Sequence, residues 1–157
     1  MQIDGFDAKI LDILQINNLL SSEQIGERVG LSPSAVQRRV RRLRKEGIIE
    51  SDVSIVSPEG IGRRLMVIIE VTLEREHATV LEDFGKLMLS TPEVMQCYYV
   101  TGDADFILIA TVRDMQDYEL FAKRFFSDNI HVKRFNSSMV IKRVKTGLVL
   151  PVGISIE

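Results

Sequence analysis

The chain has 157 residues, a formal net charge of −2 and a hydrophobic content of 45%, ordinary values for a globular protein of one or two domains. Its longest apolar stretches have the length of strands, so we expect no membrane span. The single cysteine, Cys97, excludes an internal disulfide and a cysteine-cluster metal site. We therefore expect a cytoplasmic protein that holds no metal or cofactor.

The first two predicted elements are helices. Apolar residues at helical spacing predict a helix over residues 5–17. Ser21 and Gln24 have the spacing of a capping box, which marks the start of a second helix. Gly30 then follows the short apolar stripe of that helix and is expected to end it.

The third predicted helix carries an unusual charge. Ser32 is a natural N-cap, Pro33 suits the first helical position, and Gly47 is expected to stop the helix. Six of the eight residues from Arg38 to Lys45 are basic, although the whole chain is nearly neutral. Arginines this close together repel one another unless anions lie nearby, and a phosphate backbone supplies such anions.

Helical geometry separates this third helix into two faces. At about 100° per residue, its apolar residues fall on one side and are expected to be buried. The opposite side collects most of the basic residues, whose guanidinium groups suit both phosphates and guanine edges. We expect base-edge contacts from Ser34, Gln37, Arg38 and Arg41, and phosphate contacts from Ser32, Arg42 and Lys45.

The sequence after the third helix, IIESDVSIVSP, alternates and is β-branched, which predicts a short hairpin. A helix, a short turn containing glycine, a basic helix and a hairpin together form a winged helix-turn-helix. We therefore predict a DNA-binding domain over residues 1–56, followed by a linker rich in Ser, Pro and Gly over residues 57–64.

The second half of the chain predicts a ferredoxin-like βαββαβ domain over residues 65–157, so the fold class is α+β. Tyr98 and Tyr99 are adjacent on one predicted strand, so one should face the core and the other the opposite face, a candidate dimer surface. The expected strands are 65–73, 94–100, 106–112 and one or two within 131–145, and the expected helices are 77–89 and 117–126.

A turn that reads TGDAD joins two of these strands. Gly102 permits a tight turn, and Asp103 and Asp105 are placed to accept hydrogen bonds from an α-amino group. The same residues also fit a simple hairpin turn with solvated acids. His77 and His131 have no catalytic or metal-binding partners near them in sequence, so we expect no enzyme active site.

Three stretches, FDAKILDILQ, LSPSAVQRRVRRLRKEGII and VTGDADFIL, closely resemble the Lrp/AsnC family of leucine-responsive and asparagine-operon regulators. The resemblance covers about residues 5–148. It implies a sequence-specific transcriptional regulator that binds double-stranded DNA, forms homodimers through the sheet domain and assembles further into tetramers or octamers. It also implies a small-molecule effector, usually an amino acid, bound between subunits near Thr101, Gly102, Asp103, Ala104, Asp105 and Ser137.

The chain departs from the family pattern in two places. Residues 17–21 read NNLLS, where the family has an Asp-Gly-Arg stretch. In the last strand, Phe135 replaces a threonine near the effector site, and together with Met139 it implies a smaller or more apolar pocket. An apolar effector, a different effector and no effector at all are each consistent with this change.

Two other functions fit parts of the same sequence. Sirohaem decarboxylases resemble this family, and the exposed arginines suit a polyanionic tetrapyrrole as well as a phosphate backbone. The chain has only two histidines, however, which argues against this enzyme. A protein that organises DNA with little sequence preference is the other alternative.

Overall fold

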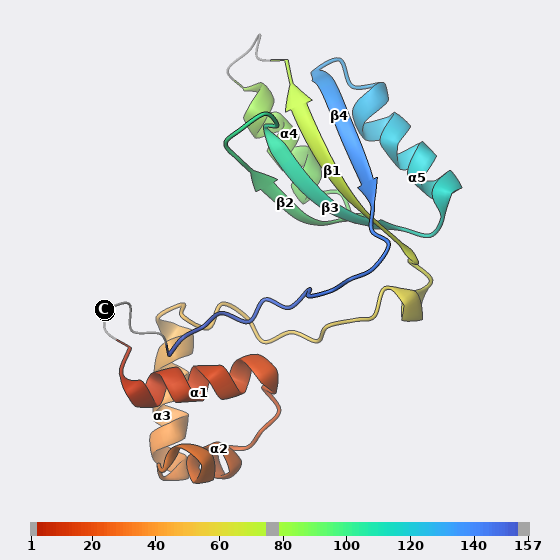
Figure 1. The fold of residues 1–157 in the computed structure, drawn as a ribbon. Helices are drawn as coiled ribbons and strands as arrows, with labels where there is room; N and C mark the ends of the chain where they lie inside the picture. The colour runs from red at the N-terminus through yellow and green to blue at the C-terminus, as the bar shows by residue number, and fades with distance from the viewer. Residues whose placement is uncertain (1–2, 75–78, 154–157) are drawn as a thin grey trace. The chain divides into compact units, whose positions relative to one another are not determined.

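The computed structural model describes residues 3–74 and 79–153 of the chain. These residues form two compact units, one of residues up to Ser54 with those from Lys145 onward, and one of Ile55–Val144. Each unit has its own hydrophobic core. Figure 1 shows three helices in the first unit and a sheet with two helices in the second.

The three predicted helices of the first unit are confirmed. Ser21 and Gln24 form the predicted capping box, and Gly30 is the C-cap that follows the second helix. The Ser32 hydroxyl caps the third helix by accepting a hydrogen bond from the Ala35 amide at 3.3 Å. The helices are α1 (Gly5–Ile16), α2 (Ser22–Val29) and α3 (Pro33–Lys45).

A small apolar core holds these helices together. Val36, Val40 and Leu43 are buried, as the helical spacing of α3 predicted. Gly26 brings α2 close to the turn that precedes α3, because a Cβ atom at this position would overlap the Leu31 carbonyl oxygen. The core cluster comprises Ile10, Ile25, Val29, Val36 and Val40.

The predicted wing hairpin is wrong. Over the described residues 50–57 the chain has no strand, and its apolar side chains, including Val53 and Ile55, are exposed. A two-stranded hairpin is marginal in water unless it packs on another surface, and no such packing occurs in this segment. Asp52 instead forms an ion pair with Arg44 of α3, so the acidic stretch is used in a side-chain contact rather than in a turn between strands.

The second unit confirms the predicted α+β class with a ferredoxin-like sheet. The four strands are antiparallel to their neighbours in the order β2-β3-β1-β4, and both helices contribute to the single core on one face of the sheet (Figure 1). The elements are β1 (Leu65–Leu73), α4 (Val80–Leu89), β2 (Val94–Tyr99), β3 (Phe106–Val112), α5 (Met115–Ala122), the π-helical turn η2 (Lys123–Ser127) and β4 (Val132–Met139).

Alternation along the strands separates a buried face from an open one. Residues of β1 at alternate positions are buried. Tyr99 pairs with the buried Phe106, and the two rings lie 5.4 Å apart on the core side of the sheet, but Tyr99 is 64% exposed. Its neighbour Tyr98 is half exposed and pairs with Ile107, so it lies on the opposite face, as predicted.

The C-terminal tail, from Lys145 onward, groups with the first unit rather than with the sheet. The side chain of Gln15 in α1 donates to the Leu150 carbonyl at 3.1 Å and accepts from the Leu150 amide at 2.7 Å. A short 3-10 turn, η1 (Glu59–Ile61), lies in the predicted linker. The predicted domain limits at residues 56 and 65 stay predictions, and the placement of the tail is the observation that departs from them.

Candidate nucleic-acid interface and effector site

The exposed face of α3 presents most of the predicted DNA-contacting side chains. Six of the seven are exposed: Ser32, Ser34, Gln37, Arg38, Arg41 and Lys45. Arg42 is half-buried. The arrangement therefore combines donors for base edges with positive charge for phosphates.

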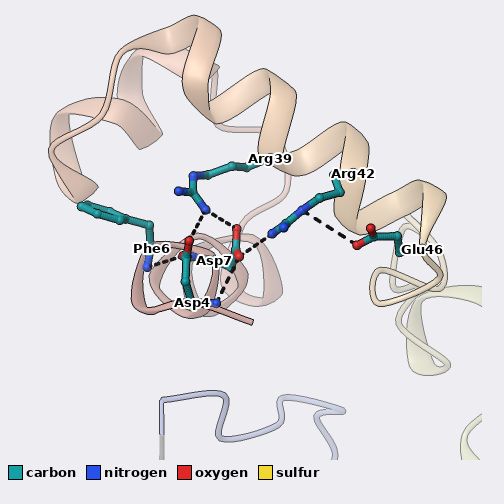
Figure 2. Close-up of polar contacts among 6 residues, drawn as sticks. All are labelled: Asp4, Phe6, Asp7, Arg39, Arg42 and Glu46. Carbon is teal, nitrogen blue, oxygen red and sulfur yellow. Dashed lines mark hydrogen bonds and ion pairs between the residues drawn. The ribbon is translucent and has the colours of Figure 1, made fainter. Parts of the chain in front are cut away.

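Half of the basic residues in the run from 38 to 45 are ion-paired within the first unit, and Figure 2 shows the pairs of Arg39 and Arg42. Arg39 donates to Asp4 at 2.7 Å and to Asp7 at 2.8 Å, and its guanidinium lies 5.5 Å from the centre of the Phe6 ring. Arg42 also pairs with Asp7, and Arg44 binds Asp52 through two hydrogen bonds of 2.9 and 3.1 Å. Among the described residues, Arg38, Arg41 and Lys45 form no ion pair.

Asp7 is the buried centre of this network. Its burial disfavours the charged form, but hydrogen bonds from Arg39, Arg42 and the Asp4 amide outweigh that penalty and hold the pKa of Asp7 below its ordinary value of 3.8. The stabilisation is therefore fully present above that ordinary pKa and is lost as the pH falls through the lower folded-state pKa. The Asp-x-x-Asp spacing at 4–7 signals the capping box of α1, but nothing in it indicates the contact with the arginines of α3.

A shallow hollow of about 280 Å³ lies beside the exposed face of α3. Asn18, from the turn before α2, and Ser22, the first residue of α2, add polar groups to it next to Gln37 and Arg41. Neither side chain was among the predicted site residues, although Asn18 lies in the stretch that departs from the family pattern. Their proximity to the basic helix is a tertiary contact that sequence spacing does not reveal.

In the second unit, the TGDAD loop is tied to the end of β1. The Asp105 amide donates to the Val71 carbonyl at 2.9 Å, and the Asp105 carboxylate accepts from the Leu73 amide at 2.8 Å. The Thr72 hydroxyl donates to the Asp103 carbonyl at 3.2 Å. Gly102 has a φ of 122°, a region that favours glycine, which confirms its predicted turn role.

The loop and two strand ends line a cavity of about 460 Å³ that is open to solvent. Its charges are mixed, with acidic groups from the loop and basic groups from β4, where Lys133 lies 3.9 Å from Glu74. A zwitterion needs such a pairing of charges, an acid for its ammonium group and a base for its carboxylate. The cavity is lined by Thr72, Leu73, Glu74, Asp103, Asp105, Lys133 and Arg134.

The remaining predicted effector residues lie elsewhere around this loop. Thr101 and Gly102 are exposed, Ala104 is half-buried, and none of them lines the cavity. Ser137 pairs with Ile69 on the helix-covered face of the sheet, and its hydroxyl oxygen is buried without a hydrogen-bond partner among the described residues. Phe135 and Met139 share that face and pack against the core.

We expect Asp105→Ala to destabilise the second unit by about 1–3 kcal/mol, because the Leu73 amide would lose its acceptor in a buried position. Asp105→Asn keeps an oxygen acceptor and is the matched control, with a smaller expected loss. Chemical unfolding followed by a probe in this unit measures both. Equal stability of the alanine variant and the parent chain would show that the carboxylate does not hold the loop.

His131 is exposed just before β4, and His77 lies outside the described residues. Across residues 3–74 and 79–153, no three His, Cys, Asp or Glu side chains gather closely enough to hold a metal ion. None of the helices in these ranges has the length and hydropathy that a bilayer crossing requires.

Two family models match the chain. The AsnC-type helix-turn-helix domain matches residues 3–44, which contain α1, α2 and most of α3. The Lrp/AsnC ligand binding domain matches residues 66–150, which contain the sheet, its helices and the TGDAD loop. The two matched regions therefore contain the exposed face of α3 and the cavity at the TGDAD loop.

Relatives and solved structures agree with these models over nearly the full chain. An HTH-type transcriptional regulator of Sinorhizobium fredii is 49% identical over 98% of this chain and 91% of its own length. The leucine-responsive regulatory protein of Haemophilus influenzae is 38% identical over 74% of this chain and 70% of its own. A transcriptional regulator of Neisseria meningitidis, solved in complex with L-Met, is 34% identical and covers 97% of this chain and 98% of its own, with a TM-score of 0.92.

These matches favour a regulator over a tetrapyrrole decarboxylase or a low-specificity DNA-organising protein. They also confirm the resemblance that the three sequence stretches indicated. The family models and the solved structure share with this chain a helix-turn-helix domain followed by a ligand-binding sheet domain. The protein belongs to the Lrp/AsnC family of transcriptional regulators.

Proposed function

We propose that this regulator reads a specific duplex site with the exposed face of α3 and changes its DNA binding when an amino acid occupies the cavity at the TGDAD loop. The observation that carries the DNA-binding part is that Arg38, Arg41 and Lys45 are exposed and form no ion pair among the described residues. Ser34 and Gln37 lie on the same face, nearer the N-terminus of α3. We assign base contacts to these two residues with Arg38 and Arg41, and phosphate contacts to Ser32 and Lys45.

The mixed charge of the cavity supports an amino acid as the effector. Asp103 and Glu74 are placed to accept from an α-ammonium group, while Lys133 and Arg134 are placed to bind an α-carboxylate. The relative from Neisseria meningitidis was solved with L-Met, which makes L-methionine the first effector to test. We infer no cofactor and no catalytic step.

Specific recognition requires more than one copy of this chain. One recognition helix reads only a few base pairs, so two half-sites are needed for useful specificity. The open face of the sheet carries partly exposed apolar side chains, including Ile68 and Tyr98, which suit a homodimer interface. Tetramers or octamers of such dimers, in the cytoplasm with the DNA, complete the proposed assembly.

The experiment is selection of bound duplexes from a random pool at near-physiological salt, with and without L-methionine and other amino acids. We expect enrichment of a site with two related halves, and a change in its affinity when the effector is added. Recovery of no enriched sequence would contradict sequence-specific regulation. An enriched site that no amino acid affects would contradict the sensing part alone.

Arg38→Ala is expected to weaken binding to the selected site by about 1–3 kcal/mol and to relax the base preference at one position. Lys45→Ala is the comparison variant, because loss of a phosphate contact weakens binding to all sequences alike. Titration of each variant against the selected site and an unrelated duplex measures both effects. An equal loss on the two duplexes would move Arg38 to the phosphate-contacting group.

A further inference from the structure

The basic run of α3 contains more positive charge than it presents to solvent. Arg39 and Arg42 are bound to acids that lie 32 and 35 residues earlier in the chain, on the first turn of α1 and at its N-cap. Two carboxylates, Asp4 and Asp7, face these two guanidinium groups, so the charges cancel locally (Figure 2). A phosphate that approaches either arginine also approaches these carboxylates, and the like charges oppose the contact.

Asp7 differs from the other acids near α3 because it is fully buried. Its two carboxylate oxygens accept from Arg39, from Arg42 and from the Asp4 amide, which makes up half of the capping box of α1. An ion pair with an ideal position and little solvent around one partner is screened weakly by salt. The pair of Arg44 with Asp52 is exposed on both sides, and such pairs contribute little and open readily.

Arg39 is further restrained by its position over the Phe6 ring, and its side chain is only 23% exposed. Arg42 lies farther along α3, with Glu46 3.8 Å from its Nε atom on the side away from Asp7 (Figure 2). Arg39 therefore contacts two acidic side chains through one nitrogen, and Arg42 lies between two acidic side chains. For either one to bind DNA, its contact with Asp7 must be broken or shared.

We propose that Asp7 is a specificity-determining residue that withholds Arg39 and Arg42 from DNA. The inference rests on the proposed DNA-binding function and goes beyond it, since it assigns a role in recognition to an acid on α1. It places Arg42, predicted as a phosphate contact, outside the set of residues that touch the duplex. The buried carboxylate keeps the non-specific affinity for DNA phosphates low, so that the remaining cations of α3 discriminate between sequences instead of binding every duplex alike.

The test compares Asp7→Asn with Asp12→Asn, which removes the same charge from an exposed position on α1. Affinity for an unrelated duplex and for the selected site is measured at several salt concentrations. For Asp7→Asn we expect tighter binding to the unrelated duplex and a smaller ratio of specific to non-specific affinity. Each freed arginine that reaches a phosphate steepens the slope of log affinity against log salt by about 0.9. Asp12→Asn is expected to keep the parent slope.

A folded Asp7→Asn chain that binds both duplexes more weakly, with the parent slope, would overturn the proposal and leave Asp7 a structural residue. Thermal unfolding shows whether the variant is folded. If Asp7→Asn is not folded, Arg39→Gln is measured in its place. We expect Arg39→Gln to keep the parent slope, and a slope flattened by about 0.9 would contradict the proposal. Failure to select a sequence would refute specific regulation and with it the specificity role of Asp7. The slope on the unrelated duplex needs no specific site, so it would still test whether Asp7 withholds Arg39 and Arg42 from phosphates. A parent chain that binds no DNA would overturn both.

Discussion

Phe126→Ala is expected to lower the free energy of unfolding of the second unit by about 3–5 kcal/mol, the usual cost of removing a buried aromatic ring. Phe126 is 1% exposed, and its ring packs 5.5 Å from that of Phe121 and 5.2 Å from that of Phe135. It therefore joins α5 and β4, the elements on either side of η2. Hydrogen exchange resolved by peptide is the measurement, because it assigns the loss of protection to particular elements.

The two cores are separate clusters, so we expect the exchange of β1, β3 and β4 to accelerate while that of α1, α2 and α3 stays near the parent rate. Leu120→Ala is the matched control, since Leu120 lies on α5 but is 63% exposed, and its truncation should cost within about 0.5 kcal/mol. Equal acceleration in both units would mean that they unfold as one cooperative body, which contradicts the proposed division into domains.

Elements with strong local signals could be predicted from the sequence. The caps at Ser21 and Ser32 and the apolar spacing of α3 depend on residues within a few positions of one another, and they fixed the helix boundaries to about one residue. The first three strands were equally clear, because β-branched runs such as 65–73 alternate between a buried and an open face. The last was predicted only as one or two strands within 131–145, where β4 is a single strand, Val132–Met139. The wing failed for the opposite reason, since its stability required a packing surface that no local pattern encodes.

The same distinction holds for the site residues, since local signals could be used for prediction and long-range contacts could not. Exposure of Arg38 and Arg41 followed from helical geometry, but the engagement of Arg42 by Asp7 joins residues 35 positions apart and has no periodic signal. In β4, a signal was present and unused. Ser137 lies two residues from both Phe135 and Met139, so the pleat places all three on one face, and the two large apolar neighbours indicate the core side.

The two aspartates of the TGDAD loop serve different purposes. Asp103 and Asp105 were assigned together to an amino group, yet Asp105 is 2% exposed and binds the Leu73 amide. The exposed Asp103 is the better placed of the two for a ligand. A carboxylate that holds the loop against β1 fixes the cavity wall, and a second carboxylate on that wall is then available to bind an ammonium group.

Ile10→Ala is expected to lower the free energy of unfolding of the first unit by about 2–5 kcal/mol, because it removes a fully buried side chain from the cluster that joins α1 to α2 and α3. The recognition helix is held at this cluster by its own Val36 and Val40, so loosening the core should also abolish specific DNA binding. Peptide-resolved hydrogen exchange and titration with the selected duplex measure the two effects on one preparation.

Ile16→Ala provides the matched control, since it makes the same chemical change on the same helix at a position that is 76% exposed. We expect its exchange and its DNA affinity to stay close to those of the parent. Exchange in β1, β3 and β4 should be unaffected by Ile10→Ala, so an effector that binds only within the second unit would still bind the variant. Retention of full DNA affinity by a chain whose α1–α3 peptides exchange freely would show that this core does not position the recognition helix.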